Sequence, residues 1–363
     1  MKKQILFLVF LVLAVFANVT VTWAQPYAAH GVAPNPLTCG TSDALHPIAG
    51  KPYNYNIGVT PAPTGTALYT WWATKGTDFI LNGTVTNTGM LTITPGQILA
   101  ATTPGYGVTG LYSTVTITWS SELLAATVSG TATGGKTPTF VAVNYTDPAS
   151  ACANNLKVYQ LDPLNGFTVD IFNRDAGGAT LAAGATTSSC VSNIASVTYN
   201  GTQLLYNYGT NTITYEVVAA NFSSSWTPAF QVGVLGNGQT ADLQWAYDNA
   251  FTSGLVTVQS GITAAGGTYT SATTVNTNVP DTSTGVSIFV RLVIHNNTYE
   301  GIADTPIALA VNGTNSAGQP DVVNTDCNTS TYMEDIANQT LTKRPAVTPT
   351  TPTGGFVPAN TTN

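Results

Sequence analysis

Polar and apolar residues alternate along much of the chain with a period of two. In the longest such run, residues 286–295, every even position is aliphatic and the odd positions carry Ser, Phe, Arg, Val and His. Successive side chains of a β-strand point to opposite faces, so the run predicts a strand whose even face lies in a core. We expect it to be a central strand.

Shorter runs of the same kind predict further half-buried antiparallel strands. They lie at residues 53–60, 114–119, 140–145, 212–217, 230–234, 241–247 and 307–311. Gly, Pro and Asn-Gly pairs separate them, which is typical of turns between strands. Two short helical turns are predicted at 97–101 and 122–126, and neither is long enough to alter an all-β fold.

Residues 152–172 divide the strands into two groups. The stretch holds a cysteine, a strand-like run (156–161), the breaker Asp162-Pro163 and a second strand-like run (167–172). Since only a few residues separate these runs, we expect a stiff two-domain rod with a small interface and no flexible tether. The predicted fold is all-β, with two tandem antiparallel β-sandwich (Ig-like or PKD-like) domains at residues 25–162 and 163–342.

Both ends of the chain differ from its middle. Two lysines, a thirteen-residue apolar run and Thr22-Trp23-Ala24 predict a secretory signal peptide at residues 1–24, with Gln25 as the mature start. A membrane anchor would need about 20 apolar residues, and the run ends too early. No later segment is long and apolar enough to span a bilayer, and residues 343–363 are predicted to form a Thr/Pro-rich, disordered tail.

The composition narrows the classes of partner. The chain has 363 residues and 43% hydrophobic residues, yet only 7% are charged, against about 25% in typical soluble domains. The formal net charge is −7, and loss of the two leader lysines brings it to about −9. A chain without a basic patch cannot neutralise phosphates, which argues against nucleic-acid binding.

Four cysteines remain after the predicted cleavage: Cys39, Cys152, Cys190 and Cys327. An even number in an exported chain favours disulfides. Of the three connectivities, Cys39–Cys152 with Cys190–Cys327 places one bridge near the two ends of each predicted domain. Zinc binding is the competing interpretation, but the spacings are too long and no histidine lies near a cysteine.

Several motifs resemble those of known surface proteins. They are Gly50 to Ile57, Tyr69-Thr70-Trp71-Trp72, Thr116 to Trp119, and Val141 to Tyr145 leading to Cys152. In this order they resemble the PKD-like and immunoglobulin-like modules of secreted and surface proteins of the Bacteroidota, and residues 163–342 resemble such sandwiches more weakly. The resemblance implies an extracellular, non-catalytic module.

Acidic residues concentrate late in the chain, at Asp321, Asp326, Glu334 and Asp335. Calcium prefers six to eight oxygen ligands, so an oxygen-rich loop of this kind is a weak candidate Ca²⁺ site. EF-hand spacing is absent, and a solvated loop explains the same residues. No other cofactor is indicated.

Three tryptophans raise the question of ligand stacking. Trp71 and Trp72 are adjacent, so on a strand they point to opposite faces and only one can enter the same core. Trp226 has a loop-like context. Each is a candidate for stacking on a sugar ring, and structural packing is the competing explanation.

Catalytic signals are weak. The three histidines are scattered, no Gly-x-Ser-x-Gly elbow occurs, and no pair of carboxylates is singled out. We therefore expect a secreted, non-catalytic structural or adhesive protein at the cell surface. A carbohydrate-binding module and, third, an extracellular hydrolase are the alternatives. Because few charges are available to protect strand edges, some edges are expected to pair with other protein chains, neighbouring subunits included.

Overall fold

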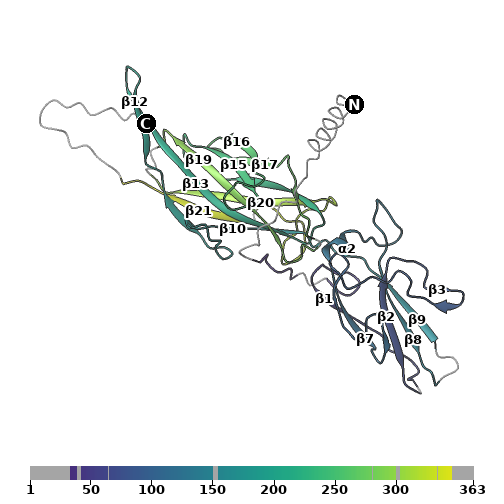
Figure 1. Ribbon diagram of the computed structural model, residues 1–363. Helices are drawn as coiled ribbons and strands as arrows, with labels where there is room; N and C mark the ends of the chain where they lie inside the picture. Colours follow the sequence, from purple (N-terminus) through teal and green to yellow (C-terminus); the bar gives the residue numbers. More distant parts are fainter. Residues whose placement is uncertain are drawn as a thin grey trace, which may run out of the picture.

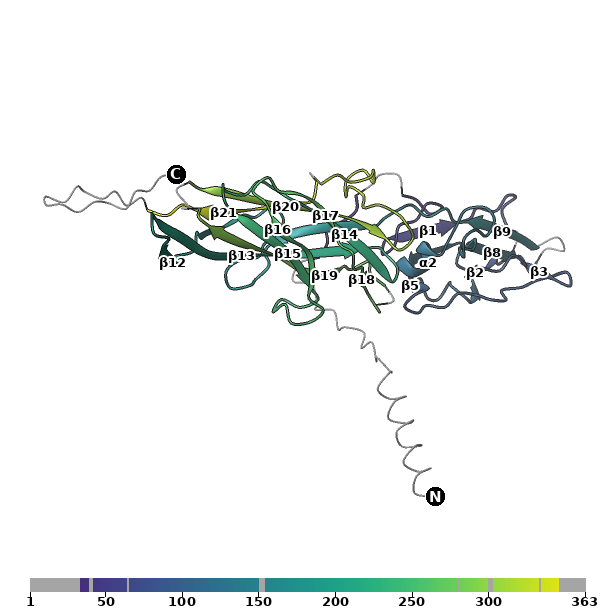
Figure 2. The ribbon, with the colours of Figure 1, turned by 90° about the horizontal axis from the view of Figure 1, so that it is seen from above.

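The computed structural model describes residues 33–38, 42–63, 65–149, 154–279, 281–299, 303–332 and 334–345. The predicted leader, Cys39, Cys152 and nearly all of the C-terminal tail lie outside these residues. The chain is almost entirely β, as predicted, and its sheets fall into two groups that lie end to end (Figures 1 and 2).

The first sandwich comprises residues 42–161. One sheet has the order β1 (Pro52–Asn56), β7 (Thr114–Trp119), β5 (Ile98–Ala101). The other has the order β6 (Thr109–Gly110), β2 (Leu68–Thr74), β8 (Phe140–Thr146), β9 (Asn154–Gln160). A small hairpin, β3 (Ile80–Leu81) and β4 (Thr84–Val85), lies apart from both.

The second sandwich comprises residues 167–342, and its first sheet contains the longest strands. The order is β10 (Thr168–Asn173), β13 (Leu204–Ala220), β19 (Val286–Asn297), β15 (Thr240–Ala246), β16 (Val256–Ile262), with β12 (Ile194–Tyr199) also pairing with β13. Strand β19 covers the run predicted to be central, and it lies between β13 and β15. The five even positions from Val286 to Ile294 all join the core, as the alternation predicts.

The other sheet of the second sandwich has the order β11 (Thr187–Cys190), β21 (Ile336–Thr342), β20 (Thr305–Asn315), β14 (Ser225–Val232), β17 (Gly267–Thr270). Strand β18 (Val275–Asn276) also pairs with β14. All these pairings are antiparallel except that of β11 with β21. A parallel edge pair of this kind needs a long crossover, and residues 191–335 supply it.

Each sandwich has a hydrophobic core of its own. One draws its residues from positions 53–161 and includes Trp71 and Trp119, and the other draws from positions 167–341 and includes Trp226 and Trp245. Large aromatic side chains bury about 150–250 Å² each and dominate such cores. We infer from this separation that the chain has two domains, with the boundary near Asp162-Pro163.

The two predicted helical turns have different outcomes. Residues 121–125 form α2, which begins because the Ser120 side chain accepts a hydrogen bond from the Leu123 N–H at 3.1 Å and so caps the helix. Residues 98–101 instead form the edge strand β5, paired with β7. The local helical preference of this short run is overridden by tertiary pairing.

Residues 33–38 lie against the second sandwich, although the sequence places them in the first domain. The Asn35 backbone N–H and side-chain amide both donate to Asp170, at 2.9 and 2.6 Å. The Thr38 N–H donates to the Asn324 carbonyl at 2.7 Å. This segment therefore packs against the second sandwich beside the Asp170 side chain of β10.

The predicted Cys190–Cys327 pair is wrong. Cys190 is a free, exposed cysteine, whereas Cys327 is disulfide-bonded. Cys190 lies beside Thr342 at one end of β21, and Cys327 precedes the other end of that strand. A seven-residue strand is roughly 20 Å long, whereas bridged cysteines have Cα atoms within about 7 Å of each other.

Candidate functional site

The two sandwiches meet at a hydrogen-bonded junction. The Asp162 N–H donates to the Leu45 carbonyl at 2.7 Å, so the connecting segment is fastened to the first sandwich. Across the junction, the Ser121 hydroxyl at the start of α2 donates to Asp281 at 3.3 Å and accepts from the Thr282 N–H at 3.0 Å. Ser121 and Thr282 are both buried, so these polar groups satisfy each other away from water.

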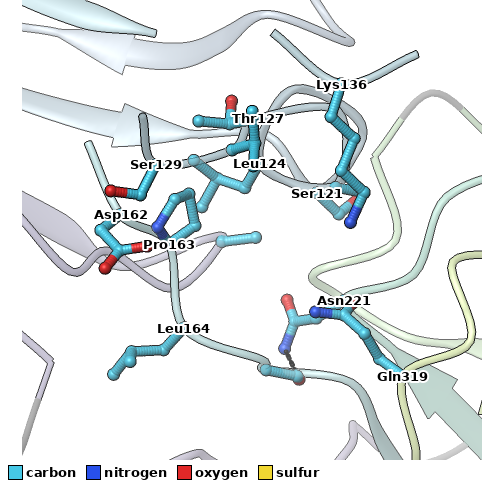
Figure 3. A pocket seen from close by; sticks show the side chains of 14 residues that line it. Ser121, Leu124, Thr127, Ser129, Lys136, Asp162, Pro163, Leu164, Asn221 and Gln319 are labelled. Carbon is cyan, nitrogen blue, oxygen red and sulfur yellow. Dashed lines mark hydrogen bonds between the residues drawn. The ribbon is translucent and has the colours of Figure 1, made fainter. Parts of the chain in front are cut away.

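A pocket of about 210 Å³ opens beside this junction (Figure 3). Its wall is built from α2 and the following loop, from the connecting segment, and from two loops of the second sandwich. The polar side chains that line it include Ser129, Lys136, Asp162, Asn221 and Gln319.

The Asn221 side chain has one satisfied and one unsatisfied group. Its amide N–H donates to the Gly166 carbonyl at 2.9 Å, while its Oδ1 is buried and has no hydrogen-bond partner. The pocket is smaller than the roughly 300–1,000 Å³ of typical ligand sites. With donors and acceptors on its wall, it suits one small polar group such as a single sugar residue.

The three candidate stacking tryptophans are all enclosed. Trp71 and Trp226 belong to the two cores, and Trp72, on the opposite face of β2, is also buried. The Trp71 Nε1–H donates to the Tyr112 carbonyl at 2.7 Å, and the Trp226 ring packs against Phe167. None presents a ring face to a ligand, which corrects the stacking interpretation in favour of packing.

The four predicted calcium ligands are split between two environments. Asp326 and Glu334 are exposed, and they accept hydrogen bonds from the backbone N–H groups of Asn328 and Thr331, at 2.9 and 2.8 Å. Asp321 is buried in the second sandwich, and Asp335 is mostly buried beside it. Among the described residues, no group of three or more His, Cys, Asp or Glu side chains is placed to hold a metal ion.

Asp321, Asp335 and Asp170 form a buried acidic cluster that the sequence does not predict. The Asp321 Oδ1 accepts a hydrogen bond from the Val169 N–H at 2.9 Å, and the carboxyl groups of Asp321 and Asp335 lie within reach of each other. Asp335 also accepts from the Ser330 hydroxyl at 3.0 Å. Asp170 is held by Asn35 and by the Asn324 side chain.

Burial controls the protonation of this cluster. Desolvation, followed by the neighbouring Asp335 carboxylate, raises the pKa of Asp321 to about 9. Desolvation and the charge of Asp170 raise the pKa of Asp335 to about 7, and desolvation raises the pKa of Asp170. The raised pKa of Asp321 favours its protonated form at neutral pH, and in that form its carboxyl can donate a hydrogen bond to Asp335.

Two histidines lie in surface pairs with acids. The His46 Nδ1 is 2.9 Å from an Asp43 oxygen, and the His295 Nε2 is 3.1 Å from an Asp242 oxygen across β19 and β15. The remaining one, His30, lies outside the described residues. We find in these two pairs no arrangement that singles out a hydrolytic centre.

A second feature missed in the sequence is the projecting hairpin, formed by β12 and the start of β13 (residues 194–208). It lies at the end of the second sandwich away from the first (Figures 1 and 2), and every residue of β12 is exposed. Its turn contains Asn200-Gly201, and no charged residue occurs between Asp175 and Glu216. These two signals mark an uncharged hairpin.

Comparison with known proteins finds remote structural likenesses. No family model and no curated protein matches the chain. Similar solved structures include CfaE, the adhesive subunit of CFA/I fimbria of enterotoxigenic Escherichia coli, with 8% identity over 86% of this chain and 83% of that one and a TM-score of 0.26.

Two further similar structures come from different functional classes. The collagen adhesin of S. aureus has 11% identity over 76% of this chain and 80% of that one, with a TM-score of 0.21. AvmM, which catalyses macrocyclization in alchivemycin A biosynthesis, has 9% identity over 51% of this chain and 93% of that one, with a TM-score of 0.23. All three likenesses have TM-scores below 0.3 and identities of 8–11%, so no function is carried over from them to this chain.

Proposed function

We propose that the protein is an exported, non-catalytic structural or adhesive protein that acts at the cell surface. The observation that carries this proposal is the junction, where two sandwiches with separate cores are joined end to end by buried hydrogen bonds. An elongated, stiff body of this kind holds one end away from the other. Such a body suits display or assembly.

Two further observations support a place outside the cell. The first is the leader-like N-terminus, whose residues lie outside the described part of the chain. The second is the disulfide at Cys327, because disulfides persist in oxidising compartments and are rare in the cytosol. In the residues that the structure describes, no helix is long and apolar enough to cross a membrane.

Binding to an array of immobilised targets tests the proposal. Beads carrying residues 25–363 are expected to be retained on at least one extracellular protein, glycan or cell surface, and to leave every polymer on the array intact. Albumin-coated beads are the control. Retention on no target would contradict an adhesive role, and release of soluble products would contradict the absence of catalysis. Retention confined to glycans would favour the carbohydrate-binding alternative, with the junction pocket as its site.

The stiffness of the junction can be tested by a substitution in the connecting segment. Gly166 lies in the connecting segment, and a Cβ added there would come within 2.6 Å of the Ile48 side chain. We expect Gly166→Val to destabilise the packed junction by about 1–3 kcal/mol, because the inserted methyl groups overpack it. Small-angle X-ray scattering should then show a broader range of interdomain angles than in the wild-type chain.

The matched control is Gly58→Val, where an added Cβ meets nothing within 4 Å. That variant should scatter like the wild-type chain. A Gly166→Val chain with unchanged scattering and unchanged stability would show that the junction does not fix the angle between the sandwiches.

A further inference from the structure

The projecting hairpin exposes apolar side chains that no described part of the chain covers. Val197 is 45% exposed and Tyr199 66% exposed, and the exposed fractions of Ile194, Leu204 and Leu205 are 39–44%. Clusters of exposed apolar residues on one element mark interaction sites more often than single exposed residues do.

Most of these side chains share one face of the hairpin. Val197 lies opposite Tyr206, and Tyr199 lies opposite Leu204. Residues directly opposite each other on antiparallel strands point to the same side, so these two pairs form a continuous apolar strip. The Tyr206 ring stacks on Tyr208, with ring centroids 6.3 Å apart, which extends the strip toward the body of the sandwich.

The outer edge of β12 is also unpaired. Among the described residues, β12 pairs with β13 alone, so the N–H and C=O groups on its other side are open to another strand. Soluble proteins usually protect such edges with Lys, Pro or a covering loop. Residues 194–199 contain no charge and no proline, and the bulge between Ile194 and Ser196 interrupts the strand only at its start.

We propose that β12 pairs antiparallel with β12 of a second copy of this chain, which joins the two molecules through one continuous sheet. An antiparallel pair of identical strands is self-complementary about a twofold axis, so a single surface serves both partners. The chain has a net charge of −7, but the forty residues from 176 to 215 contribute none of it. Two copies can therefore bring their β12 strands together without charge repulsion between residues of these strands.

Two other occupants fit the hairpin less well. A lipid surface normally contacts several Lys and Arg residues beside the apolar ones. Residues 194–208 contain neither, and Arg344 lies against the Tyr208 ring, 5.2 Å from its centroid, where the hairpin meets the sandwich. The chain's own tail follows Pro345 and contains Pro349, Pro352 and Pro358. Prolines cannot donate backbone hydrogen bonds to a neighbouring strand, so the tail is a poor partner for an open edge.

This inference names the partner for the structural role proposed above and rests on that role only for its biological purpose. Association in solution can be measured without any knowledge of secretion or of adhesive targets. A monomeric chain would therefore overturn the inference and leave the proposed function standing. Conversely, a dimeric chain that is retained on no target would contradict the adhesive role and leave the inference standing.

Sedimentation equilibrium of residues 25–363 between 1 and 100 µM tests the pairing. A six-residue strand pair buries less than the roughly 1,600 Å² of a standard stable interface, so we expect a dimer with a dissociation constant in the micromolar range. Val197→Lys should weaken dimerisation at least tenfold, because each dimer would bring two lysines to the shared edge. Val234→Lys, at a residue 69% exposed outside the hairpin, should change it less than twofold.

Mixed-charge variants separate direct pairing from a general loss of structure. Val197→Lys and Val197→Glu should each be mainly monomeric alone, and an equimolar mixture should recover dimers. A wild-type monomer at 100 µM, or equal effects of Val197→Lys and Val234→Lys, would overturn the proposal. So would dimers that appear only after removal of residues 346–363, or a monomer that sediments with phosphatidylcholine–phosphatidylglycerol vesicles.

Discussion

Replacing Trp71 by Ala is expected to lower the free energy of unfolding of the first sandwich by about 3–5 kcal/mol, the usual cost of deleting a buried aromatic side chain. Trp71 is fully enclosed in the core of residues 53–161. Its loss leaves a cavity, and it also leaves the Tyr112 carbonyl without the donor that now lies 2.7 Å away.

The second sandwich should be unaffected, since its core shares no residue with the first. Differential scanning calorimetry should resolve two transitions in the wild-type chain, and Trp71→Ala should shift only one. Trp245→Ala, in the other core, is the matched variant and should shift only the other transition. A joint shift of both transitions in either variant would show one cooperative unit, contrary to the two-domain inference.

Replacing Asp321 by Asn is expected to remove much of the pH dependence of the second sandwich. Folding raises the pKa of Asp321 from near 4 to about 9, so the folded state binds a proton that the unfolded state releases. The stabilisation from that proton is complete below about pH 4 and is lost as pH rises toward 9. One proton that is bound by the folded state and not by the unfolded state lowers the free energy of unfolding by about 1.4 kcal/mol for each unit of rising pH.

Asparagine mimics the protonated acid. Its oxygen can accept from the Val169 N–H, and its amide can donate to Asp335, as the neutral carboxyl does. Urea unfolding should be measured at pH 5, 6, 7 and 8. The free energy of unfolding of Asp321→Asn, relative to that of the wild-type chain, should increase by up to about 1.4 kcal/mol per pH unit. The charged groups that face Asp321, Asp170 and Asp335, stay in place.

Asp326→Asn is the control, because Asp326 is an exposed residue of the loop between β20 and β21. That variant should follow the wild-type pH profile. If the pH profile of Asp321→Asn also ran parallel to that of the wild-type chain, Asp321 would be ionised at neutral pH in the wild-type protein. That outcome would contradict the protonated state of Asp321.

Strand alternation made much of the fold predictable. The even positions of residues 286–295 enter the core because both neighbouring strands bury the same face. Trp71 likewise enters the core of the first sandwich, as one member of the Trp71-Trp72 pair had to. Local patterns of this kind need no knowledge of distant residues, so a single sequence reveals them.

The candidate site was less predictable because it depends on distant contacts. In the alternating pattern of its strand, Asp170 has the position of an outward-facing polar residue. It is nevertheless buried, because Asn35 and Asn324, both more than 130 positions away, cover it. The junction pocket joins loops from both sandwiches. The apolar side chains of the hairpin are exposed because no described part of the chain packs over β12. Composition alone cannot reveal any of these.

The position of β21 determines how the molecule would bear tension. This strand lies between β11 and β20, and the chain continues from its end directly into Lys343 and the tail. A pull on the tail would act along β21, roughly perpendicular to the hydrogen bonds on both of its sides. Both ladders would be loaded together in shear instead of opening one bond at a time. An anchor at the C-terminus would therefore pull on the rod in the direction in which its last strand resists best.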